Sequence, residues 1–215
     1  MSAPCYLEPI NLQDADQLAE LLRQRVLCGW DHTPEKLQQW KTKQAEGLKS
    51  LFWITTTNSN HNNNNHNGEN ESILAGHISL DAYSDPPDAE LARADKSVLA
   101  IQTFFILPEY RALRLGRRAM DLAERMAVQE PYGSPNCSVM ALTALSKRYM
   151  YDEGPEGRGF WDRIGMPMPE FSIQEWYEKL GYVGWKEEPR YQEKTVDGGV
   201  VWLWEVFMRK ELKGV

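Results

Sequence analysis

Apolar positions gather in blocks along the chain, and the longest nearly continuous block covers residues 98–107. It ends at Pro108, which cannot donate to a strand ladder, so a buried central strand should end there. Helical periodicity follows at once, because Leu115, Ala119 and Leu122 recur at spacings of four and three. The pattern predicts a strand, a tight turn and then a helix.

The remaining chain also divides into short periodic segments. Asn11 or Asp14 is the expected N-cap of the first helix, and Thr33 and Ser172 are expected caps of later helices, with a glutamate three residues after Ser172. β-branched and aromatic residues or alternating patterns predict further strands at 5–10, 51–57, 72–83, 137–145, 182–187 and 200–208. This order mixes hairpins with crossover connections, which predicts an α+β fold with a sheet of mixed direction.

The composition is that of an ordinary globular protein, with 215 residues, 42% hydrophobic and 26% charged. No apolar run approaches the roughly 20 residues of a membrane span, so no membrane association is expected. Three widely spaced cysteines suggest free thiols in a reducing compartment, and we expect a cytoplasmic protein. The net charge of −7 argues against nucleic-acid binding.

Two segments lack periodicity. Residues 58–71 are rich in asparagine and cannot bury apolar area, so we expect a mobile loop. His61 and His66 lie in this tract without a thiolate or other ligand pattern, and we expect no metal site. Residues 146–171 are rich in glycine, proline and aromatic residues; a loop of that length is often functional, and we place it on the substrate side.

The turn after the central strand has the features of an anion site. The first-turn N–H groups of a helix have no intrahelical partners, and the helix dipole favours negative charge there. Arg111, Arg114, Arg117 and Arg118 add positive charge around the turn. A solvated helix face is the alternative interpretation of these arginines.

Three segments of the chain carry a family resemblance. Residues 104–116 read Phe-Phe-Ile-Leu-Pro-Glu-Tyr-Arg-Ala-Leu-Arg-Leu-Gly, residues 176–182 read Trp-Tyr-Glu-Lys-Leu-Gly-Tyr, and a closing strand covers residues 201–210. In this order they resemble the GNAT superfamily of acetyl-CoA-dependent N-acetyltransferases, over almost the whole chain. The resemblance implies one acetyltransferase-like domain over residues 1–215, with a mixed, mostly antiparallel central sheet flanked by about four helices.

One residue departs from the family's pattern. Arg114 stands where the family usually has its first glycine, and only Gly116 remains. Glycine is favoured there because the backbone approaches a pyrophosphate closely. An arginine keeps the backbone path if its φ and ψ are helical, and its guanidinium can face a phosphate. If it instead obstructs the site, the chain is a catalytically silent acyl-CoA-binding or interaction module.

The resemblance also implies a set of site residues. Acetyl-CoA would be the co-substrate, with its arm bonded by main-chain groups of the strand and its pyrophosphate on the N–H groups of residues 113–117. Tyr177 aligns with the family's general acid, although a core aromatic on the short helix is its other interpretation. The implied cofactor-binding residues are Phe104, Phe105, Ile106, Arg111, Ala112, Leu113, Arg114, Leu115, Gly116 and Arg117.

The general base and the acceptor stay open at this point. Some family members use a glutamate on the central strand, but Ala100 takes that place here. His77, for which a core histidine is the favoured interpretation, Glu205 and a water chain are the alternatives. The expected acceptor is a primary amine of a small molecule or peptide, and the resemblance allows a homodimer. A dinucleotide-binding domain needs three spaced glycines after a strand, whereas only Gly116 is present.

Overall fold

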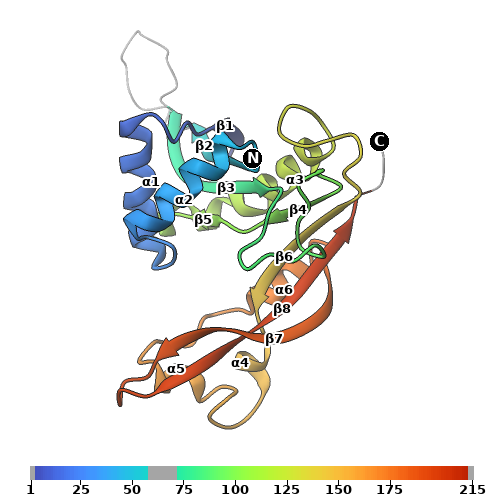
Figure 1. Cartoon of the computed structure of the whole chain (residues 1–215). Helices are drawn as coiled ribbons and strands as arrows, with labels where there is room; N and C mark the ends of the chain where they lie inside the picture. Colours follow the sequence, from blue (N-terminus) through green and yellow to red (C-terminus); the bar gives the residue numbers. More distant parts are fainter. Residues whose placement is uncertain (1–2, 58–71, 213–215) are drawn as a thin grey trace. The chain divides into compact units, whose positions relative to one another are not determined.

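The computed structural model describes residues 3–57 and 72–212 (Figure 1). The predicted loop at 58–71, with His61 and His66, lies outside the described residues. Within the described ranges eight strands form a mixed, mostly antiparallel sheet with several helices, which confirms the predicted fold class. Those ranges contain no group of three or more His, Cys, Asp or Glu that could hold a metal ion, and none of their helices combines the length and apolarity needed to cross a membrane.

The chain divides into two compact units. One comprises the described residues up to Met140 together with Leu212, and the other is Ala141–Glu211. The strand order in the first unit is β1-β2-β3-β4, with β5 also paired to β3. Its elements are β1 (Tyr6–Pro9), α1 (Ala15–Cys28), α2 (Pro34–Ala45), β2 (Lys49–Thr57), β3 (Ser72–Asp81), β4 (Val98–Ile101), β5 (Phe104–Ile106), the 3-10 helix η1 (Pro108–Leu113) and α3 (Leu115–Ala127).

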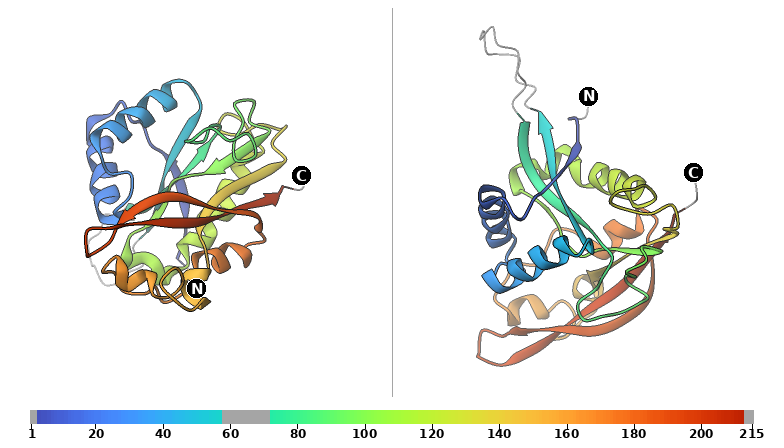
Figure 2. Two further views of the ribbon diagram at one scale, coloured as in Figure 1. Left: turned by 60° about the horizontal axis from the view of Figure 1, so that its bottom comes forward. Right: turned by 45° about the horizontal axis from the view of Figure 1, so that its top comes forward.

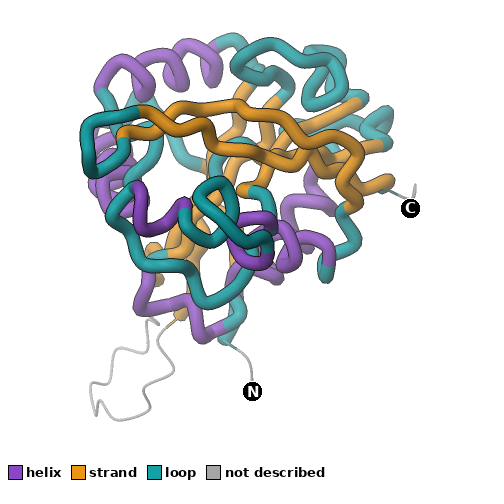
Figure 3. The backbone as a smooth tube through the Cα atoms, turned by 90° about the horizontal axis from the view of Figure 1, so that it is seen from below, coloured by secondary structure: helices purple, strands orange, loops and turns teal. Residues whose placement is uncertain are grey.

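The second unit is built on the strand order β6-β8-β7. Strands β7 and β8 pair antiparallel and form a long two-stranded ribbon (Figure 3). Its elements are β6 (Val139–Leu145), which begins at the end of the first unit, α4 (Arg148–Tyr151), α5 (Phe160–Arg163), α6 (Ile173–Glu178), β7 (Val183–Lys194) and β8 (Val200–Glu211).

The predicted helix starts are confirmed by their caps. The carboxylate of Asp14 accepts hydrogen bonds from the N–H groups of Asp16 and Gln17 at the start of α1. Thr33 caps α2, with Pro34 in the first turn, and Ser172 accepts from the N–H of Glu175 at 3.3 Å. Each cap satisfies a first-turn donor that the helix itself leaves without a partner.

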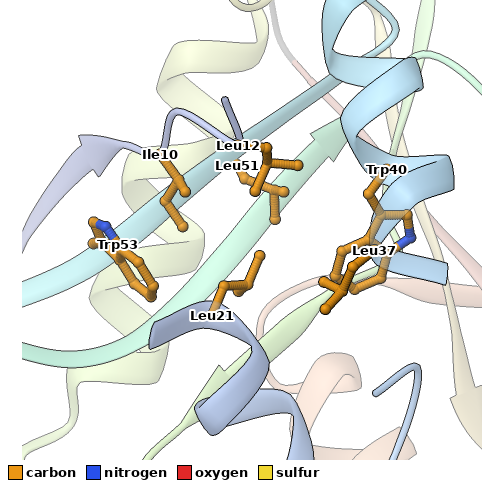
Figure 4. Packing of buried hydrophobic residues seen from close by; sticks show 7 residues of the cluster. All are labelled: Ile10, Leu12, Leu21, Leu37, Trp40, Leu51 and Trp53. Atoms are coloured by element: carbon orange, nitrogen blue, oxygen red, sulfur yellow. The ribbon is translucent and has the colours of Figure 1, made fainter. Parts of the chain in front are cut away.

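One hydrophobic cluster of the first unit lies where α1 and α2 pack on β2. Leu51 and Trp53 are two residues apart on β2, so their side chains lie on the same face of the strand. Leu21 of α1 and Trp40 of α2 pack against them there. Figure 4 shows these side chains with Ile10, Leu12 and Leu37. Figure 2 shows α3 on the other face of the strands from α1 and α2.

The strand predicted over residues 98–107 is not continuous. Asp81 of β3 pairs with Ala100, and Ile78 pairs with Phe104, so two residues of β3 face three of the opposite strand. This is a β-bulge, which divides the predicted strand into β4 and β5. Close by, Gly76 allows β3 to approach β5, since a Cβ atom there would lie 2.1 Å from the Phe105 carbonyl oxygen.

Residues 146–171, predicted as a loop, contain the short helices α4 and α5 and a core of their own. Tyr149, Phe160 and Trp161 are buried against Val201 and Leu203 of β8. The Tyr149 hydroxyl accepts from the Trp204 N–H at 2.8 Å, and the Trp161 indole N–H donates to the Tyr149 carbonyl at 2.8 Å. These aromatic residues order the segment because they bury it on the strand.

Candidate functional site

The junction from β5 through η1 to α3 turns at Arg114. This residue has φ 59° and ψ 23°, so its backbone is in the left-handed region and not in the right-handed helical one. The left-handed conformation brings Cβ close to the following carbonyl and costs about 1–2 kcal/mol for a residue other than glycine. The strain explains why a glycine suits this position, and it shows that Arg114 keeps a glycine-like backbone path.

The N-terminus of α3 differs from those of α1, α2 and α6. Those three helices have a side-chain cap and an acidic residue in the first turn. In the part of the chain that the structure describes, no side chain caps α3 and its first turn holds no acid. The exposed Arg114 and Arg117 flank it instead, although positive charge opposes the dipole at this end. The start of α3 therefore presents N–H groups and positive charge that a bound anion would complement.

The strand before the turn presents its main chain in two directions. The Ser79 N–H donates to Thr103 O at 2.8 Å, and the Leu107 N–H donates to Ala75 O at 2.9 Å, so odd-numbered residues bond to β3. By the period of a strand, the main-chain groups of Phe104 and Ile106 point away from β3. Both are half-buried, and these are the residues predicted to meet an extended arm.

The arginines around the turn have separate roles. Arg111 folds back, donating from Nε to the Ile106 carbonyl oxygen at 3.2 Å, with its guanidinium 5.9 Å from the Phe105 ring. Arg118 donates to the carbonyl oxygen of Ala3 and so belongs to the packing of the N-terminal segment. Ala112 and Leu113 are exposed on η1. Arg114 and Arg117 are therefore the cations best placed for an exposed anion at the start of α3.

These residues fit a diphosphate ester with an extended arm. An uncapped helix N-terminus offers N–H donors and a favourable dipole, and guanidinium groups match phosphate oxygens. Strand main chain pointing away from β3 can bond amide groups of an arm as a further strand would.

Tyr177, the predicted acid, lies on α6 in the second unit. It is 6% exposed, and its ring meets the rings of Trp176 and Tyr182 edge-on at 4.9 and 5.8 Å. Burial raises the pKa of the Tyr177 phenol well above its usual value near 10. The hydroxyl is thus protonated across the neutral pH range.

His77 is a buried core residue, as the favoured interpretation expected. Its Nδ1 lies 2.8 Å from Oε1 of Gln24, and its Nε2 lies 3.4 Å from Nη1 of Arg25. Burial, followed by the charges of Arg25 and Lys49, holds the pKa of His77 well below 6.5. A neutral ring held on both nitrogens does not suit a base that must take up a proton.

Glu205, the carboxylate among the alternatives for the base, is half-buried. It lies on β8, with Arg190 of β7 beside it at 3.9 Å from Nε to Oε2. Burial raises the pKa of Glu205 above 4.5, and a hydrogen bond from Thr143 and the charge of Arg190 oppose the shift. Sequence patterns did not indicate Thr143 or Arg190, because their meeting depends on how β6 and β7 flank β8.

A hollow of about 850 Å³ opens in the first unit between α2 and residues 83–95. Lys43, Tyr83, Asp85 and Arg93 are among its lining residues. None of the predicted cofactor-binding residues lines it. Its charges are mixed, so its chemistry does not identify a ligand.

A model of the acetyltransferase (GNAT) family matches residues 16–148, which include the β5–η1–α3 junction. A search of curated proteins found no match.

Several solved structures share the fold. The aminoglycoside 6′-N-acetyltransferase from Enterococcus faecium superposes with a TM-score of 0.57 at 11% identity, over 97% of each chain. A spermidine N-acetyltransferase SpeG chimera from Vibrio cholerae and hSSAT gives 0.55 at 11% identity, over 97% of this chain and 95% of the other. Arabidopsis thaliana NAA60 in complex with acetyl-CoA gives 0.53 at 10% identity, over 97% of this chain and 99% of the other. At these identities the likeness concerns the fold.

Proposed function

The chain belongs to the acetyltransferase (GNAT) family, and from this premise we propose that it moves an acetyl group from acetyl-CoA to a primary amine of a small molecule or peptide. The observation that carries the proposal is the start of α3, which lacks both a side-chain cap and a first-turn acid and is flanked by Arg114 and Arg117. This start lies within the residues that match the family.

Residues of the β5–η1–α3 junction would bind the acyl carrier. First-turn N–H groups of α3 and the guanidinium groups of Arg114 and Arg117 would hold the pyrophosphate. Main-chain groups of Phe104 and Ile106 would bond the arm, and an N–H directed at the thioester oxygen would stabilise the negative charge that develops there. One such donor is typically worth about 3–4 kcal/mol.

Two side chains would carry the proton transfers. The amine nitrogen forms a bond to the acetyl carbon, and the bond from that carbon to sulfur breaks. Tyr177, protonated at neutral pH, would give its proton to the departing thiolate. We propose Glu205 as the acceptor of the amine's proton, because its raised pKa brings it closer to the working pH than an ordinary carboxylate.

The names of the structural neighbours guide the choice of acceptors. Two of them are acetyltransferases of an aminoglycoside and of spermidine, and both of these compounds carry several amines. The net charge of −7 suits a cationic acceptor. We therefore propose a panel of polyamines, aminoglycosides, an alkyl amine and a peptide with a free N-terminus.

The test combines binding and turnover on the full chain. Acetyl-CoA at about a hundredfold excess over Kd should stabilise the protein by about 2.7 kcal/mol, seen as a raised Tm. Release of free thiol should then depend on the right amine. No change of Tm with acetyl-CoA would overturn the proposal, while binding without acetylation of any amine would favour a silent acyl-CoA-binding module, which Arg114 in place of glycine also allows.

A further inference from the structure

A buried polar network surrounds the β-bulge between β4 and β5. It consists of Lys49, Ser79, Asp81 and Thr103, all of which are 2% exposed or less. Nζ of Lys49 donates to both carboxylate oxygens of Asp81, at 2.9 and 3.1 Å. The Ser79 hydroxyl donates to Oδ2 of Asp81 at 2.6 Å. The four side chains come from β2, β3 and the bulge itself.

Thr103 is the bulge residue that this network holds. Its N–H donates to the Ser79 hydroxyl at 3.2 Å, and its carbonyl oxygen accepts from the Ser79 N–H at 2.8 Å. Its hydroxyl lies 3.4 Å from Nζ of Lys49. The main chain and the side chain of Thr103 are thus both fixed by groups that are themselves hydrogen-bonded and buried.

A buried ion pair need not increase the stability of the fold, since replacing it with well-packed apolar residues often leaves the free energy of unfolding unchanged or raises it. A fully satisfied buried network does, however, specify one geometry. Here the network specifies the position of the extra residue in the bulge. Shifting a strand by one residue turns every following residue to the opposite side. The bulge therefore decides that Phe104 and Ile106, and not Phe105, direct their main-chain groups away from β3.

We propose that Lys49, Ser79 and Asp81 are positioning residues for the arm of acyl-CoA, because they hold the bulge at Thr103 and with it the direction of the Phe104 and Ile106 main-chain groups. The inference rests on the proposed function. The Ile106 carbonyl supports the direction, since Arg111 reaches it with a 3.2 Å hydrogen bond. The network acts through the strand and touches no reacting atom.

The test separates the arm of CoA from its nucleotide. Calorimetry on the full chain measures Kd for acetyl-CoA and for 3′-phospho-ADP, which carries the pyrophosphate without the arm. Ser79→Ala removes the acceptor of the Thr103 N–H, and one lost hydrogen bond should raise Kd for acetyl-CoA about three- to tenfold. The Kd for 3′-phospho-ADP should stay within about twofold, because the pyrophosphate site shares no partner with Ser79.

Two further variants keep the test decisive. Thr56→Val is the matched control, because it removes a buried hydroxyl of the same unit that donates to the Pro4 carbonyl at 2.7 Å, and it should change neither Kd. If Ser79→Ala does not fold, Thr103→Val removes a network hydroxyl at constant shape, while Thr103→Ser keeps it. Acetyl-CoA affinity should fall in the valine variant and be retained in the serine variant.

Each outcome has one meaning. An equal loss for both ligands, or none for acetyl-CoA, would overturn the positioning role while leaving the proposed function standing. Failure of the wild-type chain to bind acetyl-CoA would overturn the proposed function, and this inference with it.

Discussion

Nζ of Lys49 lies 2.9 Å from Oδ1 of Asp81, and neither side chain is exposed to solvent. Burial lowers the pKa of Lys49, and the charge of Asp81 opposes that shift. The Lys49 ammonium also lies 4.5 Å from the centroid of the Trp40 ring on α2, which is within the range of a cation–π interaction. The pair joins β2 and β3 at the point where the neighbouring strand bulges.

Breaking this pair should be far more harmful than replacing it. Lys49→Met leaves the Asp81 carboxylate buried without a cation and should cost about 3–5 kcal/mol in the free energy of unfolding. The double variant Lys49→Met/Asp81→Leu should regain most of that loss. Urea denaturation measures the free energy of unfolding of the single and the double variant. Lys36→Met is the control, because the Lys36–Asp85 pair is partly exposed and should contribute about 1 kcal/mol or less. Equal losses in the single and the double variant would show that the pair itself stabilises the fold.

The left-handed backbone of Arg114 gives a second expectation. Arg114→Gly should raise the free energy of unfolding by about 0.5–1 kcal/mol, since relief of strain exceeds the extra entropy of an unfolded glycine. Arg117→Gly, within α3, should lower it by about the same amount. Denaturant unfolding of both variants compares them, and a destabilised Arg114→Gly would mean that the arginine side chain makes compensating contacts.

Tyr177→Phe should lower kcat about a hundredfold, the lower range for loss of a general acid, and leave Kd for acetyl-CoA unchanged. The phenyl ring keeps the packing against Trp176 and Tyr182. Tyr151→Phe is the control, because its hydroxyl is on the exposed side of the same unit and bonds to Glu175. Steady-state release of free thiol measures kcat in both variants. Full turnover in Tyr177→Phe would contradict the role of Tyr177 as the general acid.

Glu205 should leave a signature in the pH profile. Its pKa is raised, so a base at this position is inactivated by protonation as pH falls, and kcat/KM should decline on the acidic side at a higher pH than for an ordinary glutamate. Glu205→Gln should lose this limb and most of the activity at neutral pH. The exposed Glu188→Gln on β7 should behave as wild type. An unchanged profile in Glu205→Gln would point to water as the proton acceptor.

Local signals were sufficient for much of the fold. The caps at Thr33 and Ser172 are short-range chemistry, and the structure confirms both. The bulge at Thr103 is different, because residues 98–107 read as one apolar strand. The groups that hold the bulge come from Lys49 and Asp81, and their burial depends on how β2 and β3 pair. A lysine and an aspartate in strands ordinarily predict exposed positions.

The candidate site shows the same division. The turn and helix start at 108–117 were predicted from the sequence, whereas the left-handed backbone of Arg114, which explains why glycine suits this position, is known only from the structure. Folding of Arg111 onto Ile106 and of Arg118 onto Ala3 could not be predicted, since four neighbouring arginines look alike in sequence. The environment of Glu205 depends on Thr143 and Arg190, which are distant along the chain.

The central claim is that the start of α3 binds the diphosphate of acetyl-CoA. Its most direct test is calorimetric titration of acetyl-CoA into Arg117→Glu and Arg125→Glu, which make the same charge change at the two ends of α3. A glutamate in the first turn suits the helix dipole, so Arg117→Glu should retain its Tm. It should nevertheless weaken acetyl-CoA binding by about tenfold or more, as expected for replacing a charge-assisted bond with repulsion, while Arg125→Glu binds as wild type. Equal affinity in both variants and the wild type would contradict the claim.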